Sequence, residues 1–217
     1  MDIQERLTAF ALLGAAWVMW LLVALSIVSV AIALERIYFF LVTRDDVDLL
    51  RKDLLANLKK GEVDGARRRL QQSKSFEAMV AVAALDSAGD GAEAAQERMQ
   101  GEQQLAKLHM ERNLAFLGTV GNNAPFVGLL GTVIGIIRAF HSLDESQGKI
   151  TAGLMADIGE ALVATAIGIL VALPAVAMFN YFQRLIKTRI GRGQALGSHV
   201  LSFLLSDRNT AQPEAAE

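Results

Sequence analysis

The sequence contains no cysteine among its 217 residues, which excludes disulfide bonds, thiolate chemistry and cysteine-based metal sites. Only three histidines are present, His109, His141 and His199, and they lie far apart. Because no two of them are four residues apart, the spacing typical of a histidine metal site is missing. The formal net charge of −2 also argues against nucleic-acid binding, which usually needs a basic excess. We therefore predict no metal, no cofactor and no nucleic-acid partner.

Patterns typical of enzymes are missing as well. The sequence shows no paired carboxylates, nucleophile elbow or metal cluster. The glycines between positions 118 and 135 lack the Gly-Lys-Ser/Thr ending of a phosphate-binding loop and follow no predicted strand. The triple arginine at 67–69 is closely flanked by acids, which favours a solvated helix face over a lipid or nucleic-acid patch. These observations predict a protein that is not an enzyme.

Long apolar runs are present instead, and hydrophobic residues make up 53% of the chain. This share is high for a soluble domain and low for a protein that lies in the membrane throughout. Three runs are longer than the about 20 residues that a spanning helix needs: 10–34, 114–140 and 158–183. The predicted fold class is all-α, a three-span polytopic membrane protein whose long helices extend into a cytoplasmic helical domain.

The first run has a competing interpretation as a signal peptide, because Ala31-Ile32-Ala33 mimics a cleavage site. The run is longer than the about 7–15 residues of a signal core, and no basic region precedes it. We therefore predict that it is a retained anchor.

Polar segments separate the three runs. Residues 35–113 mix 13 basic with 14 acidic residues and contain no proline. No helix breaker separates residues 92–112 from the second run, so one helix is predicted to continue from water into the membrane. One apolar stripe of this domain recurs at helical spacing: Leu49, Leu50, Leu54, Leu55 and Leu58. The other predicted segments are a short periplasmic N-terminus (1–9), the cytoplasmic helical domain (35–113), a periplasmic loop (141–157), a cytoplasmic helix (184–205) and a disordered tail (206–217).

Basic residues near the ends of the runs predict the orientation. Four of them lie between positions 36 and 52, and four more lie between positions 184 and 192. The N-terminus offers only Arg6, and the connection between the second and third runs offers only Arg138 and Lys149. The positive-inside rule therefore predicts an N-terminus outside and a large domain and C-terminus in the cytoplasm.

The third run carries an acid at its start and small residues along one side. Glu160 lies at the mouth of an otherwise apolar helix, where a carboxylate is costly and needs an explanation. Spacings of three and four residues place the small side chains on one face, which lets another helix pack closely. The residues of this stripe are Ala161, Thr165, Gly168, Ala172 and Ala175.

The second run presents a similar face. Gly131 and Gly135 form a Gly-x-x-x-Gly pair, and Gly128 and Thr132 lie on the same side. Two simpler interpretations stay open: Thr132 can bond back to its own helix, and Glu160 can merely complement the helix dipole. If the two faces meet, they form a hydroxyl-bearing channel wall with a carboxylate at its outer mouth.

Such a wall lacks a proton carrier. Between Ala161 and Phe182 no side chain titrates near neutral pH, and Thr165 can only relay hydrogen bonds. A proton relay through a membrane needs a buried Asp, Glu or His. We therefore expect the missing carboxylate to come from a partner helix, and we expect the chain alone not to conduct.

At these residues the chain resembles a known family. Residues 124–140 read A-P-F-V-G-L-L-G-T-V-I-G-I-I-R-A-F and are similar to the second-span signature of the MotA/TolQ/ExbB proton-channel family. Glu160-Ala161-Leu162, with the later Thr165-Ala166-Ile167-Gly168 and Leu173-Pro174-Ala175, is similar to the third-span signature. The likeness covers residues 117–182. Three spans favour the TolQ/ExbB branch over the four-span flagellar stators, and the short N-terminus is typical of TolQ or gliding-motility motor subunits.

The resemblance implies a bacterial inner-membrane protein that forms a homo-oligomeric ring, typically a pentamer. The ring encloses the single spanning helices of an ExbD/TolR-type partner dimer, which carries the protonatable Asp. Thr132 and Thr165 fall on the family's pore threonines, and Glu160 falls on its third-span acid. The small-residue faces and the two signatures together give the residues expected to pack the helices: Gly128, Gly131, Gly135, Ala161, Gly168, Ala172 and Pro174.

The implied activity is a proton-driven motor whose energy source is the proton gradient. Proton flow would move the ring against its partner and power outer-membrane transport, envelope maintenance or gliding motility, with a TonB/TolA-like or motility protein as a further partner. The alternative is a non-conducting membrane scaffold that assembles a complex through its cytoplasmic helices. Arg138 departs from the expected pattern, and Asp144, Glu145 and Asp157 are the acids that it could pair with.

Overall fold

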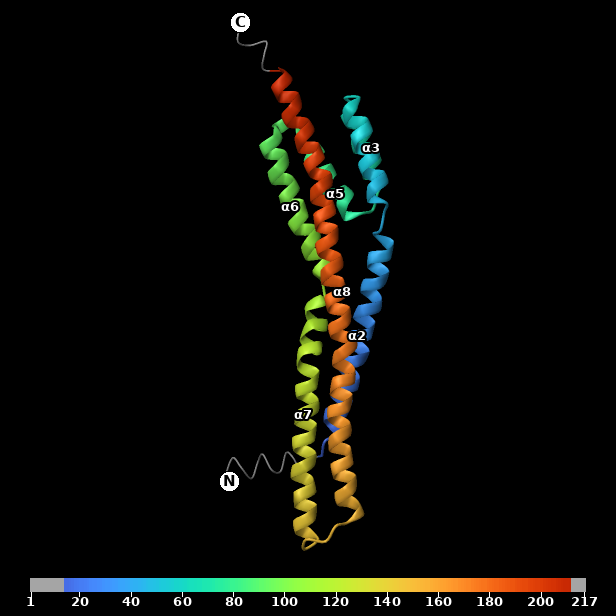
Figure 1. Cartoon of the computed structure of the whole chain (residues 1–217), viewed down its shortest axis with the longest axis vertical. Coiled ribbons are helices and arrows are strands. Elements are labelled where there is room, and N and C mark those ends of the chain that lie inside the picture. Colours follow the sequence, from blue (N-terminus) through green and yellow to red (C-terminus); the bar gives the residue numbers. More distant parts are fainter. Residues whose placement is uncertain (1–13, 212–217) are drawn as a thin grey trace. The chain divides into compact units, whose positions relative to one another are not determined.

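The computed structural model describes residues 14–211 of the chain, with side chains described through residue 206. Within these residues the chain forms helices and no strand, which confirms the all-α prediction (Figure 1). The predicted N-terminal segment 1–9 and the start of the first predicted span lie outside the described residues. The helices are α2 (Ala16–Val42), α3 (Val47–Lys59), α4 (Val63–Gln71), α5 (Phe76–Asp86), η1 (Ala88–Asp90), α6 (Ala92–Glu111), α7 (Leu114–Glu145) and α8 (Ala152–Ala211).

The chain divides into two compact units, and each is described by itself. The three-helix unit comprises Met1–Glu35 and Asn113–Tyr181, and the domain unit comprises Arg36–Arg112 and Phe182–Glu217. The helices α2 and α8 contribute residues to both units. Three helices, α2, α7 and α8, are long and apolar enough to cross a membrane.

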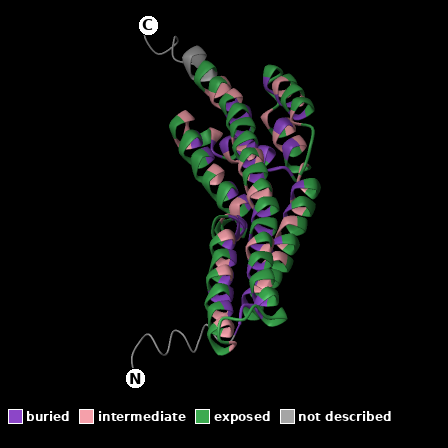
Figure 2. Ribbon diagram, turned by 60° about the horizontal axis from the view of Figure 1, so that its bottom comes forward, coloured by how far each residue is buried: buried purple, intermediate pink, exposed green. Residues whose placement is uncertain are grey.

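In the three-helix unit, α7 and α8 form an antiparallel hairpin against which the first part of α2 packs (Figure 1). The buried cluster combines Val18 and Leu22 of α2 with Val120 of α7 and Ala172 of α8. Much of the outward surface of the three helices is exposed (Figure 2), and the exposed residues include large apolar ones on α2, α7 and α8. A helix bundle with its apolar surface turned outward is what a lipid environment requires.

In the domain unit, short helices begin at side-chain caps. The Asp46 carboxylate accepts hydrogen bonds from the backbone N–H groups of Asp48 and Leu49, at 3.0 and 3.1 Å, and so starts α3. The Ser75 hydroxyl accepts a bond from the Ala78 N–H at 3.2 Å and starts α5.

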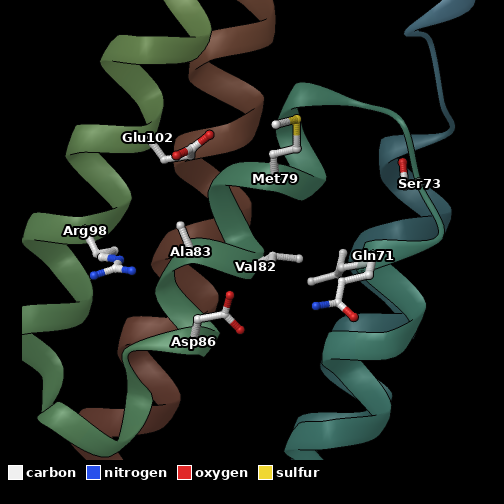
Figure 3. A pocket seen from close by; sticks show the side chains of 9 residues that line it. Gln71, Ser73, Met79, Val82, Ala83, Asp86, Arg98 and Glu102 are labelled. Atoms are coloured by element: carbon white, nitrogen blue, oxygen red, sulfur yellow. The ribbon is translucent and has the colours of Figure 1, made fainter.

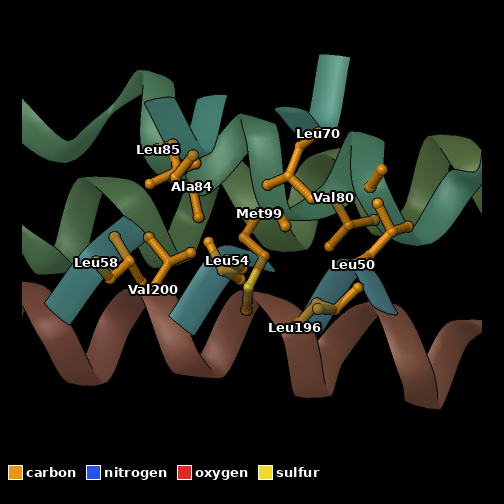
Figure 4. Packing of buried hydrophobic residues seen from close by; sticks show 13 residues of the cluster. Leu50, Leu54, Leu58, Leu70, Val80, Ala84, Leu85, Met99, Leu196 and Val200 are labelled. Carbon is orange, nitrogen blue, oxygen red and sulfur yellow. The ribbon is translucent and has the colours of Figure 1, made fainter. Parts of the chain in front are cut away.

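Burial then selects one face of α3. Leu50, Leu54 and Leu58 are buried, as the helical spacing predicts, whereas Leu49 is exposed and Leu55 is half-buried. The three leucines pack against residues of the other helices of the unit (Figure 4). These partners are Leu70 of α4, Val80, Ala84 and Leu85 of α5, Met99 of α6, and Leu196 and Val200 of α8.

The helices continue past three of the predicted segment bounds. The predicted loop 141–157 is mostly helical, and the irregular connection covers only residues 146–151. The α8 helix continues to Ala211, so the predicted disordered tail begins too early at 206. The α2 helix continues to Val42, eight residues past the predicted end of the first span at 34. At the ends of α7 and α8, helix-compatible polar residues extend a helix that an apolar core has already nucleated, whereas residues 35–42 of α2 are mostly apolar and aromatic.

The predicted continuous helix through residues 92–140 is also wrong. The α6 helix ends at Glu111 and α7 begins at Leu114. Between them Arg112 is extended, with φ −51° and ψ 132°, and Asn113 is left-handed, with φ 64°. Asparagine tolerates this conformation better than most residues, and it interrupts the helix without the glycine or proline that usually marks a break.

Candidate functional site

The contact between α7 and α8 is built from small residues that let the two backbones approach. A Cβ atom placed on Gly128 would lie 2.8 Å from the Ala164 carbonyl oxygen. One placed on Gly168 would lie 2.7 Å from the Ala124 carbonyl oxygen, and one on Gly135 would lie 2.5 Å from the Ala161 Cβ atom. Only glycine leaves room at these three positions, so the helices touch along their backbones.

The remaining predicted packing residues divide between two contacts. A Cβ atom on Gly131 would lie 2.6 Å from the Ala164 Cβ atom and 3.3 Å from a methyl carbon of Val18. Gly131 therefore lies where α2, α7 and α8 meet. Ala172 belongs to the buried cluster with α2. Pro174 lies within α8, is exposed and does not belong to that buried cluster.

The α7–α8 contact brings Thr132 and Thr165 together. Their hydroxyl groups are hydrogen-bonded to one another. The Thr165 hydroxyl also lies 3.2 Å from the Gly128 carbonyl oxygen, and the Thr132 hydroxyl lies 3.4 Å from the carbonyl oxygens of Gly128 and Ala161. Both threonines are half-buried. Each hydroxyl has one proton and more than one acceptor, so this pair can exchange its hydrogen-bond pattern without moving a backbone.

The threonine pair can relay hydrogen bonds but cannot store a proton. A hydroxyl group stays neutral across the physiological range. Along α8 no Asp, Glu, His, Lys or Arg occurs between Ala161 and Tyr181, and along α7 none occurs between Leu114 and Ile137. An acid that takes up and releases protons at this level of the hairpin must therefore come from outside the two helices.

A charged cluster lies near the connected end of the same hairpin. Arg138 of α7 pairs with Asp157 of α8, with 3.2 Å between Nε and Oδ1, and approaches Glu160 more loosely, with 3.9 Å between Nη1 and Oε2. The Ser142 hydroxyl donates to the other Asp157 oxygen at 3.0 Å. Asp157 is buried and has two partners, whereas Glu160 is half-buried and has just the longer contact among the residues that the structure describes. Glu160 is thus the less constrained acid of the cluster.

Replacing Asp157 with alanine is expected to lower the free energy of unfolding by about 1–3 kcal/mol, because it leaves Arg138 and Ser142 without their acceptor. The melting temperature of the purified chain in detergent measures this loss. The matched control is Asp144→Ala, which removes an exposed acid from the same end of α7. Equal melting temperatures for the two variants would show that the cluster contributes no stability.

A second charged contact lies within the domain unit. The Arg189 guanidinium of α8 donates to the Phe40 carbonyl oxygen at 2.8 Å, and to the Thr43 carbonyl oxygen and hydroxyl at 3.1 and 2.8 Å. These are acceptors at the end of α2, where helix carbonyls lack partners. The same guanidinium lies 4.0 Å from the Glu77 carboxylate. Both charged residues are buried, and burial raises the pKa of Glu77 although Arg189 opposes this shift.

A cavity of about 340 Å³ also lies in the domain unit, among α4, α5 and α6 (Figure 3). Arg98 and Glu102 of α6 line it opposite Met79 and Asp86 of α5. Asp86 is already paired with Arg67, with 2.8 Å between Oδ1 and Nε. Over the described residues, no three His, Asp or Glu side chains gather in a way that could hold a metal ion.

Two of these contacts were not predicted from the sequence. No sequence motif marks Ser142 as a partner of Asp157. It lies four residues after Arg138, and so one turn further along the same face of α7. The Glu77–Arg189 contact joins residues 112 positions apart, and each looks like an ordinary solvated charge in its own helix. An acid inside the apolar sequence F-E-A-M-V-A-V was the available signal for burial of Glu77.

Comparison with known proteins places these residues in a family. A model of the MotA/TolQ/ExbB proton channel family matches residues 66–194, more than half of the chain. The Tol-Pal system protein TolQ of Pseudomonas aeruginosa is 46% identical over 83 residues, which are 38% of this chain and 36% of that protein. The biopolymer transport protein ExbB of Aquifex aeolicus is 36% identical over 94 residues, which are 43% of this chain and 63% of that protein.

A third relative, the biopolymer transport protein ExbB of Salmonella typhimurium, is 45% identical over 76 residues, 35% of this chain and 31% of that protein. In all three comparisons the match spans less than two thirds of the relative's own length.

Proposed function

The chain belongs to the MotA/TolQ/ExbB proton channel family, and we propose that it is the ring-forming subunit of a motor driven by the proton-motive force. The observation that carries this proposal is the hydrogen-bonded pair of Thr132 and Thr165 on the close contact between α7 and α8. The pair places two hydroxyl groups in an otherwise apolar stretch of the membrane segment, where polar groups usually mark an ion path.

In this proposal a partner supplies the proton carrier. The partner is of the ExbD/TolR type, with a single spanning helix that bears an Asp, and its dimer occupies the centre of a ring of five copies of this chain. Thr132 and Thr165 offer hydrogen bonds to the ionised carboxylate and to water beside it. Glu160, held loosely by Arg138, provides negative charge at the outer mouth. Protonation and release of the partner's Asp then shift the partner relative to the ring.

The proposed setting is the bacterial inner membrane. The distribution of basic residues supports a periplasmic N-terminus and a cytoplasmic domain and C-terminus. The work delivered is energised outer-membrane transport, envelope maintenance or gliding motility, and it passes through a TonB/TolA-like or motility protein. The names of the relatives, a Tol-Pal system protein and biopolymer transport proteins, support a role in the cell envelope or in transport, and gliding motility rests on the resemblance alone.

The hydroxyl groups are the testable part of the proposal. Thr165→Val removes the hydroxyl and keeps the side-chain shape, and we expect it to lower proton flux about 10-fold or more, the effect of losing one hydrogen bond to a charged group. Thr132→Val is expected to act similarly. Flux is measured in liposomes that hold the chain and its ExbD/TolR-type partner, under an imposed pH gradient.

The matched control for each position is the serine variant, which keeps the hydroxyl. We expect Thr165→Ser and Thr132→Ser to retain most of the flux. Each variant is first checked for assembly with the partner, so that a failure to form the complex is not mistaken for a blocked path. Wild-type flux in assembled complexes of both valine variants would contradict the role of the threonine pair.

A non-conducting scaffold is the second candidate. It is favoured by the domain unit, which has a buried core of its own and so can serve as an assembly platform. A scaffold predicts that the complex of wild-type chain and partner carries no proton flux. The same liposome measurement therefore separates the two functions.

A further inference from the structure

Two asparagines lie side by side within the apolar part of α7. Asn122 and Asn123 are both exposed on the surface of the three-helix unit. A carboxamide that faces lipid without a hydrogen-bond partner is costly, because the hydrocarbon offers none. Each of these side chains therefore needs a partner, either within the chain or outside it.

The two asparagines differ in how this need is met. The Asn123 side chain donates through Nδ2 to the Thr119 carbonyl oxygen of its own helix, at 2.8 Å. The Asn122 side chain makes no hydrogen bond to any of the residues that the structure describes. Asn122 is therefore the one of the pair whose partner lies outside the chain.

The two asparagines also point in different directions around α7. With 3.6 residues per turn, Asn122 lies about 80° around the helix from Thr132, whereas Asn123 lies about 180° from it. Gly131 touches Val18 and so marks the side of α7 that α2 covers. Asn122 lies about 180° from Gly131, on the side that α2 leaves open. Asn122 thus lies on the exposed side of α7, about 80° around the helix from Thr132, which itself packs against α8.

We propose that the Asn122 carboxamide lines the same water-containing passage as Thr132 and Thr165, as a positioning residue for the proton path. This inference rests on the proposed function. A rise of 1.5 Å per residue puts Asn122 about 15 Å along α7 from Thr132, toward the start of the helix. A carboxamide donates and accepts hydrogen bonds but does not titrate, so Asn122 orders water between the threonine pair and the cytoplasmic side.

The absence of cysteine makes a direct test possible. Asn122→Cys and Asn123→Cys each introduce a single thiol into the full chain. The chain is assembled with its ExbD/TolR-type partner in membrane vesicles and treated with a charged, membrane-impermeant methanethiosulfonate. Because the thiolate forms only where water reaches it, we expect Asn122→Cys to react about 10-fold or more faster than Asn123→Cys. Reaction in detergent after denaturation should be equal for the two variants.

Slow labelling of the Asn122→Cys variant, or equal labelling rates for both variants, overturns the inference, whether lipid or a neighbouring protein covers the site.

A second measurement uses proton flux in liposomes. Asn122→Leu is expected to lower flux about 10-fold and Asn122→Ser to restore much of it, whereas Asn123→Leu stays near wild type. If the wild-type complex carries no flux, the proposed function fails and labelling alone still decides whether Asn122 faces water. If the wild type conducts and Asn122→Leu conducts equally, only this inference fails.

Discussion

Replacing Arg189 with methionine is expected to lower the stability of the domain unit by about 3–5 kcal/mol, because it leaves a buried carboxylate without its opposite charge. Glu77 is only 3% exposed and has Arg189 as its ion-pair partner. The substitution also removes the donors to the Phe40 and Thr43 carbonyl oxygens at the end of α2. Urea unfolding of the full chain in detergent, followed by helical circular dichroism, measures the loss.

The matched control is Lys187→Met, which removes an exposed charge two residues earlier in α8. We expect this control to change stability by less than about 0.5 kcal/mol. The double variant Arg189→Met with Glu77→Gln should regain a large part of the loss, because it no longer buries a lone charge. A double variant as unstable as Arg189→Met alone would assign the loss to the α2 carbonyl groups instead.

The pH dependence of this loss follows from the raised pKa of Glu77. A raised pKa means that the folded chain holds a proton which the unfolded chain has already released, so the stability contributed by Glu77 falls as pH rises through that interval. Arg189 is one of the groups that lower this pKa, so its removal raises the pKa further and extends the interval upward. We therefore expect Arg189→Met to be less destabilising at mildly acidic pH than at neutral pH. An equal loss at both pH values would contradict this account.

Replacing Gly128 with alanine is the second change for which we expect a large effect. The added Cβ atom would lie 2.8 Å from the Ala164 carbonyl oxygen and 3.0 Å from the Thr165 Cα atom. Both neighbours belong to the backbone, so α7 and α8 must move apart, at a cost of about 1–3 kcal/mol. The Thr165 hydroxyl also loses its position beside the Gly128 carbonyl oxygen. We expect a lower melting temperature and a proton flux reduced about 10-fold or more.

The control for this change is Gly159→Ala in α8, where an added Cβ atom would meet nothing within 4 Å in the chain. We expect this variant to be as stable as wild type or slightly more stable, because alanine favours helix by about 1 kcal/mol over glycine. If Gly128→Ala and Gly159→Ala have the same melting temperature and the same proton flux, the close approach of the two helices contributes to neither.

The helices of this protein could be predicted from the sequence to the extent that they carry an apolar pattern. The three long runs and the leucine stripe of α3 were sufficient to predict the all-α class. The break at Asn113 could not be predicted, because asparagine is compatible with helix and the left-handed conformation depends on packing around it. The α7 and α8 helices continue past the predicted segment ends for the same reason, since polar residues continue a helix as readily as they end it.

Only part of the candidate site could be predicted from the sequence. Spacing put Thr132 on the glycine face of its helix, and its pairing with Thr165 needed the register between α7 and α8. Arg138 had three candidate acids nearby, and the structure selects Asp157, which faces it from α8. Arg138 also approaches Glu160, which was not among the three. An ion pair between two helices depends on how the helices pack and has no local sequence pattern. A sequence can therefore give only a set of candidate partners.

The six-residue connection at 146–151 bears on how the chain enters the membrane during synthesis. Arg138 and Asp157 lie only 19 positions apart and on opposite arms of one hairpin, so they can meet as soon as both arms have left the ribosome. In the proposed orientation these two charges must cross the bilayer. Crossing as a joined pair with no net charge costs less than carrying a lone arginine and a lone aspartate through hydrocarbon. The ion pair thereby favours insertion of α7 and α8 as one helical hairpin rather than one helix after the other.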